Sequence, residues 1–202
     1  MVSSYNAEEF FNPLLPDADI KYFKNFLSEK EATDYFQRLL VNIEWKQHSI
    51  KIFGKSLPQP RLTALYGETG LAYTYSGLTL KPHPFTHDLK AIKNKIKQFS
   101  PETFTHCLAN LYRDGSDSMG LHADDEQELG KDPVIASVSL GETRKFRLKH
   151  KFDKNLKLNI DLEPGSLLIM QGTTQHFWKH ELPKTSIIKG QRINLTYRKI
   201  IL

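Results

Sequence analysis

The second half of the chain is a succession of short apolar and polar alternations, and no convincing helical pattern follows Pro101. A period of two is typical of strands that bury one face. Turn signals such as Glu163-Pro164-Gly165 separate the runs. Many short strands with turns between them favour a sandwich or a barrel. We therefore predict a mainly β fold, with strands at residues 104–112, 134–140, 145–149, 156–162, 166–171, 174–179 and 193–200.

The first half adds helical patterns to this β region. Ser28, with Glu31 three residues later, has the pattern of a capping box before apolar residues at helical spacing. Thr86 is the expected cap of a second helix. The chain of 202 residues, 39% hydrophobic, suits one domain over 1–202. We expect a loosely attached arm at residues 1–18 and further strands at 19–26, 45–53 and 62–66.

Several classes of protein are disfavoured by composition. Cys107 is the one cysteine, so neither an intramolecular disulfide framework nor a zinc finger is possible. The N-terminus lacks the pattern of a signal peptide, and no apolar run reaches the ~18 residues of a membrane span. We expect an intracellular protein, cytoplasmic if bacterial and nuclear if eukaryotic. The net charge of +5 permits a nucleic-acid partner, although ordinary solubility explains it equally well.

His122 and Asp124 form the first candidate site. Side chains two apart on an extended chain point to the same side, so this pair offers an imidazole and a carboxylate to one metal. A second histidine would complete a 2-His-1-carboxylate site for Fe(II). Most such pairs are ordinary surface residues, so the motif alone is weak. His150, His176 and His180 are candidates for the third ligand, and periodicity does not choose among them.

The last expected strand alternates strictly from Arg192 to Arg198. Ile193, Leu195 and Tyr197 share one face, and Arg192, Asn194, Thr196 and Arg198 share the other. Such a polar face is ordinarily turned to water. It would also make a dicarboxylate clamp, because a guanidinium grips a carboxylate through two parallel hydrogen bonds. Asn110 and Tyr112, two apart on another strand, would extend that polar wall.

Together these motifs resemble the AlkB family of Fe(II)- and 2-oxoglutarate-dependent dioxygenases, in particular the branch that repairs alkylated DNA. The Arg-x-Asn-x-Thr-x-Arg strand combined with His-x-Asp is the specific part, and the matches cover roughly residues 50–200. The matching segments are Asn110-Leu-Tyr112, His122-Ala-Asp124-Asp125-Glu126, Trp178-Lys-His180-Glu-Leu-Pro183, Arg192 to Arg198, Ile52-Phe53-Gly54, Pro60-Arg61 and Tyr73-Thr-Tyr75-Ser-Gly77.

The resemblance implies a double-stranded β-helix, or jelly roll, in an α+β, mainly β chain. The core would be residues 101–202, flanked by N-terminal helices and by a β-hairpin nucleotide-recognition lid at 45–80. It implies that His122, Asp124 and His180 bind iron. It further implies a 2-oxoglutarate pocket in which Arg192 grips the distal carboxylate and Arg198 lies by Asp124, with Asn110, Tyr112, Asn194 and Thr196 lining the rest.

The implied reaction uses Fe(II), 2-oxoglutarate and O2 to oxidise an N-methyl group on a base such as 1-methyladenine or 3-methylcytosine. Succinate, CO2 and formaldehyde are released. The base must leave its stack to reach the metal. The resemblance implies that Tyr75 packs on it, that Phe53 fills the gap in the stack, and that Arg61 contacts the phosphate backbone. Tyr73, Ser76, Asp125 and Glu126 would complete the substrate site.

Strand preference stays open at this point. The family member specialised for duplex DNA has a basic cluster after the distal histidine, and residues 184–189 here are mostly without one, while Lys149-His150-Lys151 is a basic patch elsewhere. We expect a monomer acting on alkylated DNA, single- or double-stranded. The alternatives are the same chemistry on RNA or tRNA bases, and a non-catalytic β-sandwich module that binds nucleic acid.

Overall fold

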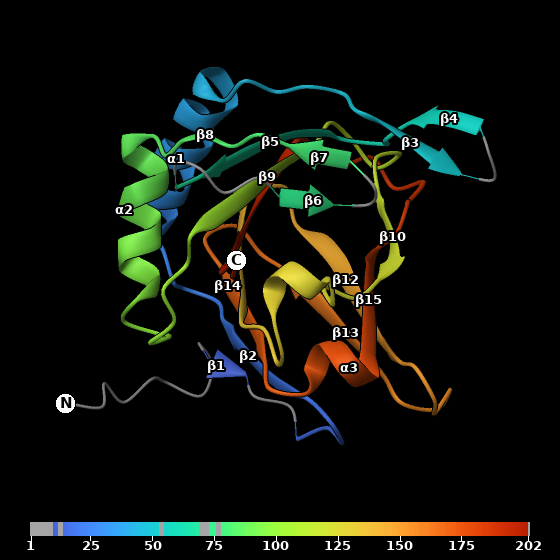
Figure 1. Cartoon of the computed structure of the whole chain (residues 1–202). Helices are drawn as coiled ribbons and strands as arrows, with labels where there is room; N and C mark the ends of the chain where they lie inside the picture. The colour runs from blue at the N-terminus through green and yellow to red at the C-terminus, as the bar shows by residue number, and fades with distance from the viewer. Residues whose placement is uncertain (1–9, 12–13, 53–54, 69–72, 76–77, 202) are drawn as a thin grey trace.

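Two β-sheets of unequal size face each other at the centre of the molecule (Figure 1). The computed structural model describes residues 10–11, 14–52, 55–68, 73–75 and 78–201. The large sheet has the order β1-β2-β14-β11-β16-β9-β5-β8 and the small sheet the order β10-β15-β12-β13. This arrangement fits the expected jelly roll. The strands of the large sheet are β1 (Phe10–Phe11), β2 (Asp19–Phe23), β14 (Leu167–Gln171), β11 (Ile135–Gly141), β16 (Arg192–Arg198), β9 (His106–Tyr112), β5 (Leu62–Gly67) and β8 (His83–Pro84). Those of the small sheet are β10 (Met119–His122), β15 (Trp178–Leu182), β12 (Arg144–His150) and β13 (Lys157–Leu162).

Two apolar clusters lie on opposite faces of the large sheet. On the outer face, Leu195 and Val138 pack with Leu39 and Ile92 of the two long helices. On the inner face, Leu108 and Leu168 pack with Phe146 and other residues of the small sheet. The helices are α1 (Glu29–Asn42) and α2 (His87–Ile96). Both helices therefore pack on the outer face of the large sheet. Its inner face contacts the small sheet and carries the polar residues described below.

Both helix starts are confirmed. Ser28 and Glu31 form a reciprocal capping box at α1, and the Thr86 side chain accepts a hydrogen bond from the backbone of Leu89 at α2. These caps satisfy backbone N–H groups that a helix start would otherwise leave unpaired.

The strand predicted at residues 174–179 is wrong. The chain instead forms one helical turn, α3 (Thr174–Phe177), and then β15. Gly172, with φ of +58°, ends β14 in a conformation that favours glycine. The Thr174 hydroxyl then donates to the Gln171 carbonyl at 2.6 Å and stabilises the turn. β10 was also not predicted as a strand, although the extended chain assumed at His122 is present.

The region expected to be the lid, residues 45–80, contains two small hairpins and, between them, β5, which belongs to the large sheet instead. One pairs β3 (Ser49–Ile52) with β4 (Lys55–Pro58), and the other pairs β6 (Tyr73–Tyr75) with β7 (Leu78–Leu80). Figure 1 shows β3 and β4 at the upper right, and β6 and β7 in the upper part of the picture, at the level of β5 and β9. In the first hairpin Ile52 pairs with Lys55. Phe53, expected to fill the gap in the stack, lies outside the described residues.

The segment predicted as a loosely attached arm is docked over its described residues. Phe10 and Phe11 pair with β2. The Trp178 indole donates to the Pro16 carbonyl at 3.0 Å, and His150 lies 3.4 Å from the Asp17 carboxylate. No helix in the described part of the chain is long and apolar enough to cross a membrane.

Candidate metal centre

His122, Asp124 and His180 come together between the two sheets. One donor atom from each lies within 4.8 Å of the others. Strand pairing produces this meeting, because His122 ends β10 directly opposite His180 on β15. The two rings meet edge to face, with centroids 4.3 Å apart. Asp124 follows two residues after His122 and is 1% exposed.

The protonation states of these three groups suit a divalent cation. Burial lowers the pKa of His180 to about 3 and also lowers the pKa of His122, so both rings are neutral near pH 7. Burial alone would raise the pKa of Asp124, but Arg198 and the two histidines lower it to about 2. The centre therefore offers two neutral imidazoles and one carboxylate, the donor set of a 2-His-1-carboxylate site.

A contact with a backbone carbonyl selects one tautomer of the His122 ring. Nδ1 lies 2.8 Å from the Gly120 carbonyl, which can only accept, so Nδ1 carries the proton. The lone pair is then on Nε2, which lies 3.7 Å from Asp124 Oδ1. A carbonyl partner on the second ring nitrogen is the usual support of a metal-binding histidine.

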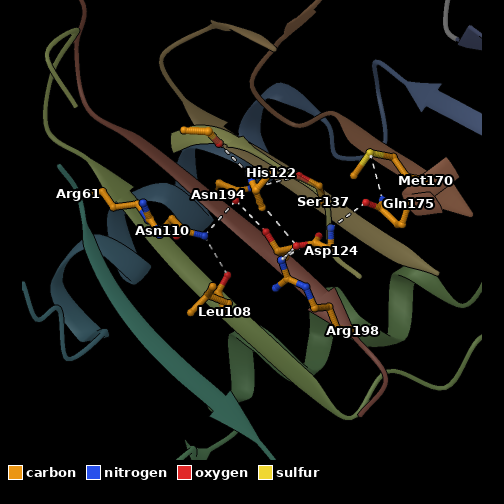
Figure 2. Close-up of polar contacts among 12 residues, drawn as sticks. Arg61, Leu108, Asn110, His122, Asp124, Ser137, Met170, Gln175, Asn194 and Arg198 are labelled. Carbon is orange, nitrogen blue, oxygen red and sulfur yellow. Dashed lines mark hydrogen bonds and ion pairs between the residues drawn. The ribbon is translucent and has the colours of Figure 1, made fainter. Parts of the chain in front are cut away.

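Asp124 is held from two sides (Figure 2). Nη2 of Arg198 donates to both carboxylate oxygens, at 2.9 and 3.0 Å. The backbone N–H of Asp124 donates to Oε1 of Gln175 at 2.9 Å. Gln175 is fully buried on α3. The helical turn that replaces the predicted strand thus supplies a support for Asp124.

The polar face of β16 is turned inward rather than to water. All seven residues of the strand are buried. Asn194 donates to Ser137 Oγ at 2.8 Å and accepts from Thr196 Oγ1 at 2.8 Å and from Asn110 Nδ2 at 3.2 Å. Arg192 lies opposite Tyr112, and Asn194 lies opposite Asn110. The polar face that alternation defined, and that the resemblance placed in a pocket, therefore lies between the sheets as a polar wall.

Arg192 marks the far end of this wall. Its guanidinium lies 5.3 Å from the Tyr112 ring centroid and donates to Ser139 Oγ at 2.9 Å. Burial lowers its pKa to about 10, so it is still a cation at neutral pH. Its Nε is buried and has no hydrogen-bond partner among the described residues. A buried cation with a spare donor fits an anionic ligand.

A single pocket contains both the metal-binding cluster and the polar wall of β16. Because this wall has an arginine at each end, Arg192 and Arg198, we call it the arginine wall. The nine residues expected to bind iron or 2-oxoglutarate all line the pocket, together with apolar side chains such as Phe146, Leu182 and Met170. His150 and His176, the other candidate ligands, lie elsewhere: His176 pairs with Asp132 at 2.8 Å on the surface. The nine are His122, Asp124, His180, Asn110, Tyr112, Arg192, Asn194, Thr196 and Arg198.

Comparison with known proteins agrees with the metal-binding cluster and the arginines found in this pocket. Residues 19–198 match the family described as the 2OG-Fe(II) oxygenase superfamily. The chain is 39% identical over 182 residues to the human protein named DNA oxidative demethylase ALKBH2, covering 85% of this chain and 70% of that protein. The chain belongs to the AlkB family of these oxygenases.

Other relatives place the chain in the same AlkB family. It is 40% identical over 187 residues to the human protein named alpha-ketoglutarate-dependent dioxygenase alkB homolog 3, covering 88% of this chain. The chain spans 65% of that protein's length, slightly under two thirds. A solved structure described as the structure of OsALKBH1 superposes with a TM-score of 0.66 at 21% identity, covering 89% of this chain and 96% of that one, and supports the fold.

The AlkB assignment implies Fe(II), 2-oxoglutarate and O2, as the resemblance led us to expect. The residues present fit that set. The His-Asp-His cluster supplies the donors, and Arg192 with its spare Nε supplies a cation for a carboxylate. The sequence motifs did not include Gln175, Ser137 or Ser139. Ser137 and Ser139 could have been noticed, because they alternate within the otherwise apolar β11. No sequence pattern indicated Gln175, because its contact with Asp124 depends on the helical turn α3.

The expected substrate residues are placed unevenly. Arg61 does not lie at the surface, where an arginine that binds a phosphate backbone belongs. It is 4% exposed and donates from Nε to Asn110 Oδ1 at 3.0 Å. Asp125 is half-exposed and pairs with Lys151 at 3.1 Å. Phe53 and Ser76 lie outside the described residues, and of Tyr73 and Tyr75 the structure gives only their strand, β6.

Glu126 is the more unusual of the two acids after Asp124. Its Oε2 is buried without a hydrogen-bond partner among the described residues. Burial, reinforced by the charge of Asp124, raises the pKa of Glu126 to about 6. An unsatisfied carboxylate oxygen close to the metal-binding cluster can accept a hydrogen bond from a bound molecule.

Proposed function

We propose that this chain is an oxidative demethylase that removes N-alkyl groups, such as those of 1-methyladenine and 3-methylcytosine, from DNA. It would consume 2-oxoglutarate and O2 and release succinate, CO2 and formaldehyde. The observation that carries the proposal is the single pocket that contains both His122, Asp124 and His180 and the arginine wall of β16. The names of two relatives support the same reaction. One is called a dioxygenase and the other a DNA oxidative demethylase.

In this proposal His122, Asp124 and His180 hold Fe(II). Three protein ligands leave coordination positions open for small molecules. The bound metal with its co-substrate supplies the oxidation of the N-methyl group. The protein fixes the geometry: Gly120 sets the His122 tautomer, and Arg198 and Gln175 fix Asp124.

The arginine wall would bind 2-oxoglutarate. Arg192 has the charge and the free Nε to receive the carboxylate farther from the metal. Asn110, Asn194 and Thr196 already form a continuous hydrogen-bonded row between the two arginines. Tyr112 packs against the Arg192 guanidinium and orients it. Arg61 takes a different role from the expected one, because its bond to Asn110 positions that amide.

The alkylated base would enter from the side of Asp125 and Glu126. Alkylation at N1 of adenine or N3 of cytosine leaves a positive charge on the base, which a carboxylate favours. Glu126, with one unsatisfied buried oxygen, is the better placed of the two. We keep Tyr73, Tyr75, Ser76 and Phe53 as proposed contacts to the base and its stack, by resemblance alone. Because DNA is the proposed substrate, we also expect the protein to act inside cells, and we keep a monomer as a proposal.

A product assay tests this function. The chain is incubated with Fe(II), 2-oxoglutarate and single- or double-stranded DNA carrying 1-methyladenine, with matched RNA in parallel. We expect formaldehyde and succinate in equal amounts together with repaired adenine in DNA. Repair of RNA alone would replace the DNA assignment. Succinate without any repaired base in either nucleic acid would refute demethylation.

A further inference from the structure

The outer face of the small sheet contains three lysines in a row, and it lies outside the pocket described above. We propose that this lysine row, Lys157, Lys149 and Lys179, binds the phosphate backbone of a single-stranded segment next to the base that enters the pocket. The inference deepens the proposed function and rests on nucleic acid being the substrate. It assigns this chain a second contact surface for that substrate.

The row is a consequence of strand register. Lys149 on β12 lies directly opposite Lys157 on β13 and directly opposite Lys179 on β15. Cross-strand partners point to the same face of a sheet, and neighbouring strands are about 4.8 Å apart. Buried neighbours such as Leu148 and His180 point to the inner face, so the three lysines point outward.

This arrangement is unfavourable without an anion. Like charges directly opposite each other on neighbouring strands destabilise a sheet. Lys149 is offset by Glu181, which lies 2.7 Å away. Lys157 and Lys179 are exposed, and within the described part of the chain neither pairs with a carboxylate. Two uncompensated cations beside a third favour a polyanion with regularly spaced charges.

A surface hollow extends the row toward the proposed metal centre. Its lining includes all three row lysines, two more lysines from the β12–β13 turn, Lys151 and Lys154, and Leu121. Leu121 directly precedes His122 in β10. Lys151 also pairs with Asp125, the neighbour of Asp124. A strand lying in this hollow would therefore pass Lys151 and reach Asp125, on the side from which the base is proposed to enter. Figure 1 shows β10, β15, β12 and β13 together on the side of the molecule away from α2.

An exposed aromatic ring at the end of the hollow selects a single strand. Phe152, in the same β12–β13 turn, is 77% exposed. Its neighbours Lys151 and Lys154 line the hollow. Aromatic rings interleaved with cations are typical of surfaces that bind single strands, because unpaired bases can stack on them. In a duplex the bases are already stacked, so Phe152 has no base to receive.

Binding of unmodified oligonucleotides tests the row without relying on catalysis. The probe is a fluorescein-labelled 15-nucleotide single-stranded DNA, titrated with the full chain at several salt concentrations. The test variant is Lys157→Gln/Lys179→Gln. The matched control, Lys90→Gln/Lys97→Gln, removes the same charge from exposed positions at α2. We expect the test variant to lose about fivefold or more in affinity and its salt slope to shrink by about 1.4. The control should change less than about twofold.

Thermal unfolding and a short substrate complete the design. Because like charges repel within the row, the test variant should unfold at the same or a higher temperature than the wild type, so weaker binding is not a folding defect. A methylated trinucleotide is too short to fill both pocket and row, and its demethylation should be unchanged. If the wild type fails on the trinucleotide and on long substrates, the demethylase proposal fails, and the anisotropy titration still decides the row.

Three results would overturn the inference. Equal loss in the test and control variants would mean a general charge effect. No loss in the test variant would mean that the row does not contact the strand. An equal loss for a blunt duplex and a single strand would contradict the single-strand assignment, as would a Phe152→Ser variant that binds single strands as well as the wild type does.

Discussion

Arg198 and Asp124 form a buried ion pair in which one nitrogen, Nη2, contacts both carboxylate oxygens at 2.9 and 3.0 Å. Their side chains are 5% and 1% exposed. The arginine keeps the only carboxylate of the proposed metal centre ionised and fixes its plane. Burial without that cation would raise the pKa of Asp124.

Arg198→Met should weaken metal binding. Without the cation Asp124 loses its orientation and part of its ionised population, and loss of such a supporting contact typically lowers metal affinity 10- to 100-fold. Calorimetric titration with Mn(II) measures this. Arg192→Met is the control, because Arg192 contacts Ser139 and Tyr112 rather than a proposed ligand. Equal Mn(II) affinity in the wild type and Arg198→Met would show that the pair does not support the metal.

Arg192→Met should raise the 2-oxoglutarate requirement. The variant removes the buried cation and leaves Asn194 and Thr196 in place, so the Kd for 2-oxoglutarate should rise by roughly 10-fold or more, the cost of one charged hydrogen-bonding partner. Binding of 2-oxoglutarate to the Mn(II)-loaded protein is the measurement. Affinity for an unmodified oligonucleotide should stay unchanged. A parallel fall in both affinities would place Arg192 outside the co-substrate pocket.

Gln175→Met should cost stability and metal affinity together. The substitution keeps the approximate volume but leaves the buried N–H of Asp124 without its acceptor, which costs about 1 to 3 kcal/mol. Urea unfolding of the metal-free protein measures the first effect, and Mn(II) titration measures the second. The neighbouring His176→Gln, whose ring pairs with Asp132 at the surface, is a suitable control. Wild-type stability in Gln175→Met would contradict this role.

Arg144→Met should loosen the loops next to Tyr112. Arg144 is 2% exposed and donates to the carbonyls of Asp114, Asp117 and Pro183 at 2.8–2.9 Å. Losing these bonds should destabilise the fold by about 2 to 4 kcal/mol. Faster amide hydrogen exchange in residues 113–118 and 183–185 is the specific measurement. Arg147→Met, exposed on the same strand, should leave both quantities unchanged.

Local sequence patterns correctly predicted the elements that are determined by residues close to them in the sequence. Capping by Ser28 and Thr86 needs only nearby residues, and both helices begin as expected. The alternation in β16 gave the correct division of faces. Periodicity could not say whether the polar face met water or the interior, because burial depends on the sheet that packs against it. The resemblance supplied that information.

The predictions that failed did so because the outcome depended on tertiary contacts, which no local sequence pattern contains. Residues 174–177 form a helical turn because Gly172 and the Thr174 hydroxyl stabilise it, a combination that an alternating pattern conceals. Arg61 was assigned to a phosphate by motif, yet its side chain folds inward to Asn110 across paired strands. The lysine row depends on the register of three strands whose members are 8 and 30 positions from Lys149, so no local window contains it.

Anaerobic titration with Fe(II) in the presence of 2-oxoglutarate tests the central claim most directly. If His122, Asp124 and His180 hold iron beside a co-substrate bound by Arg192, a weak visible charge-transfer band should grow to saturation at one Fe(II) per chain. The band should be absent in Asp124→Ala. A wild-type protein without the band, or a band of equal intensity in Asp124→Ala, would contradict the proposed metal centre.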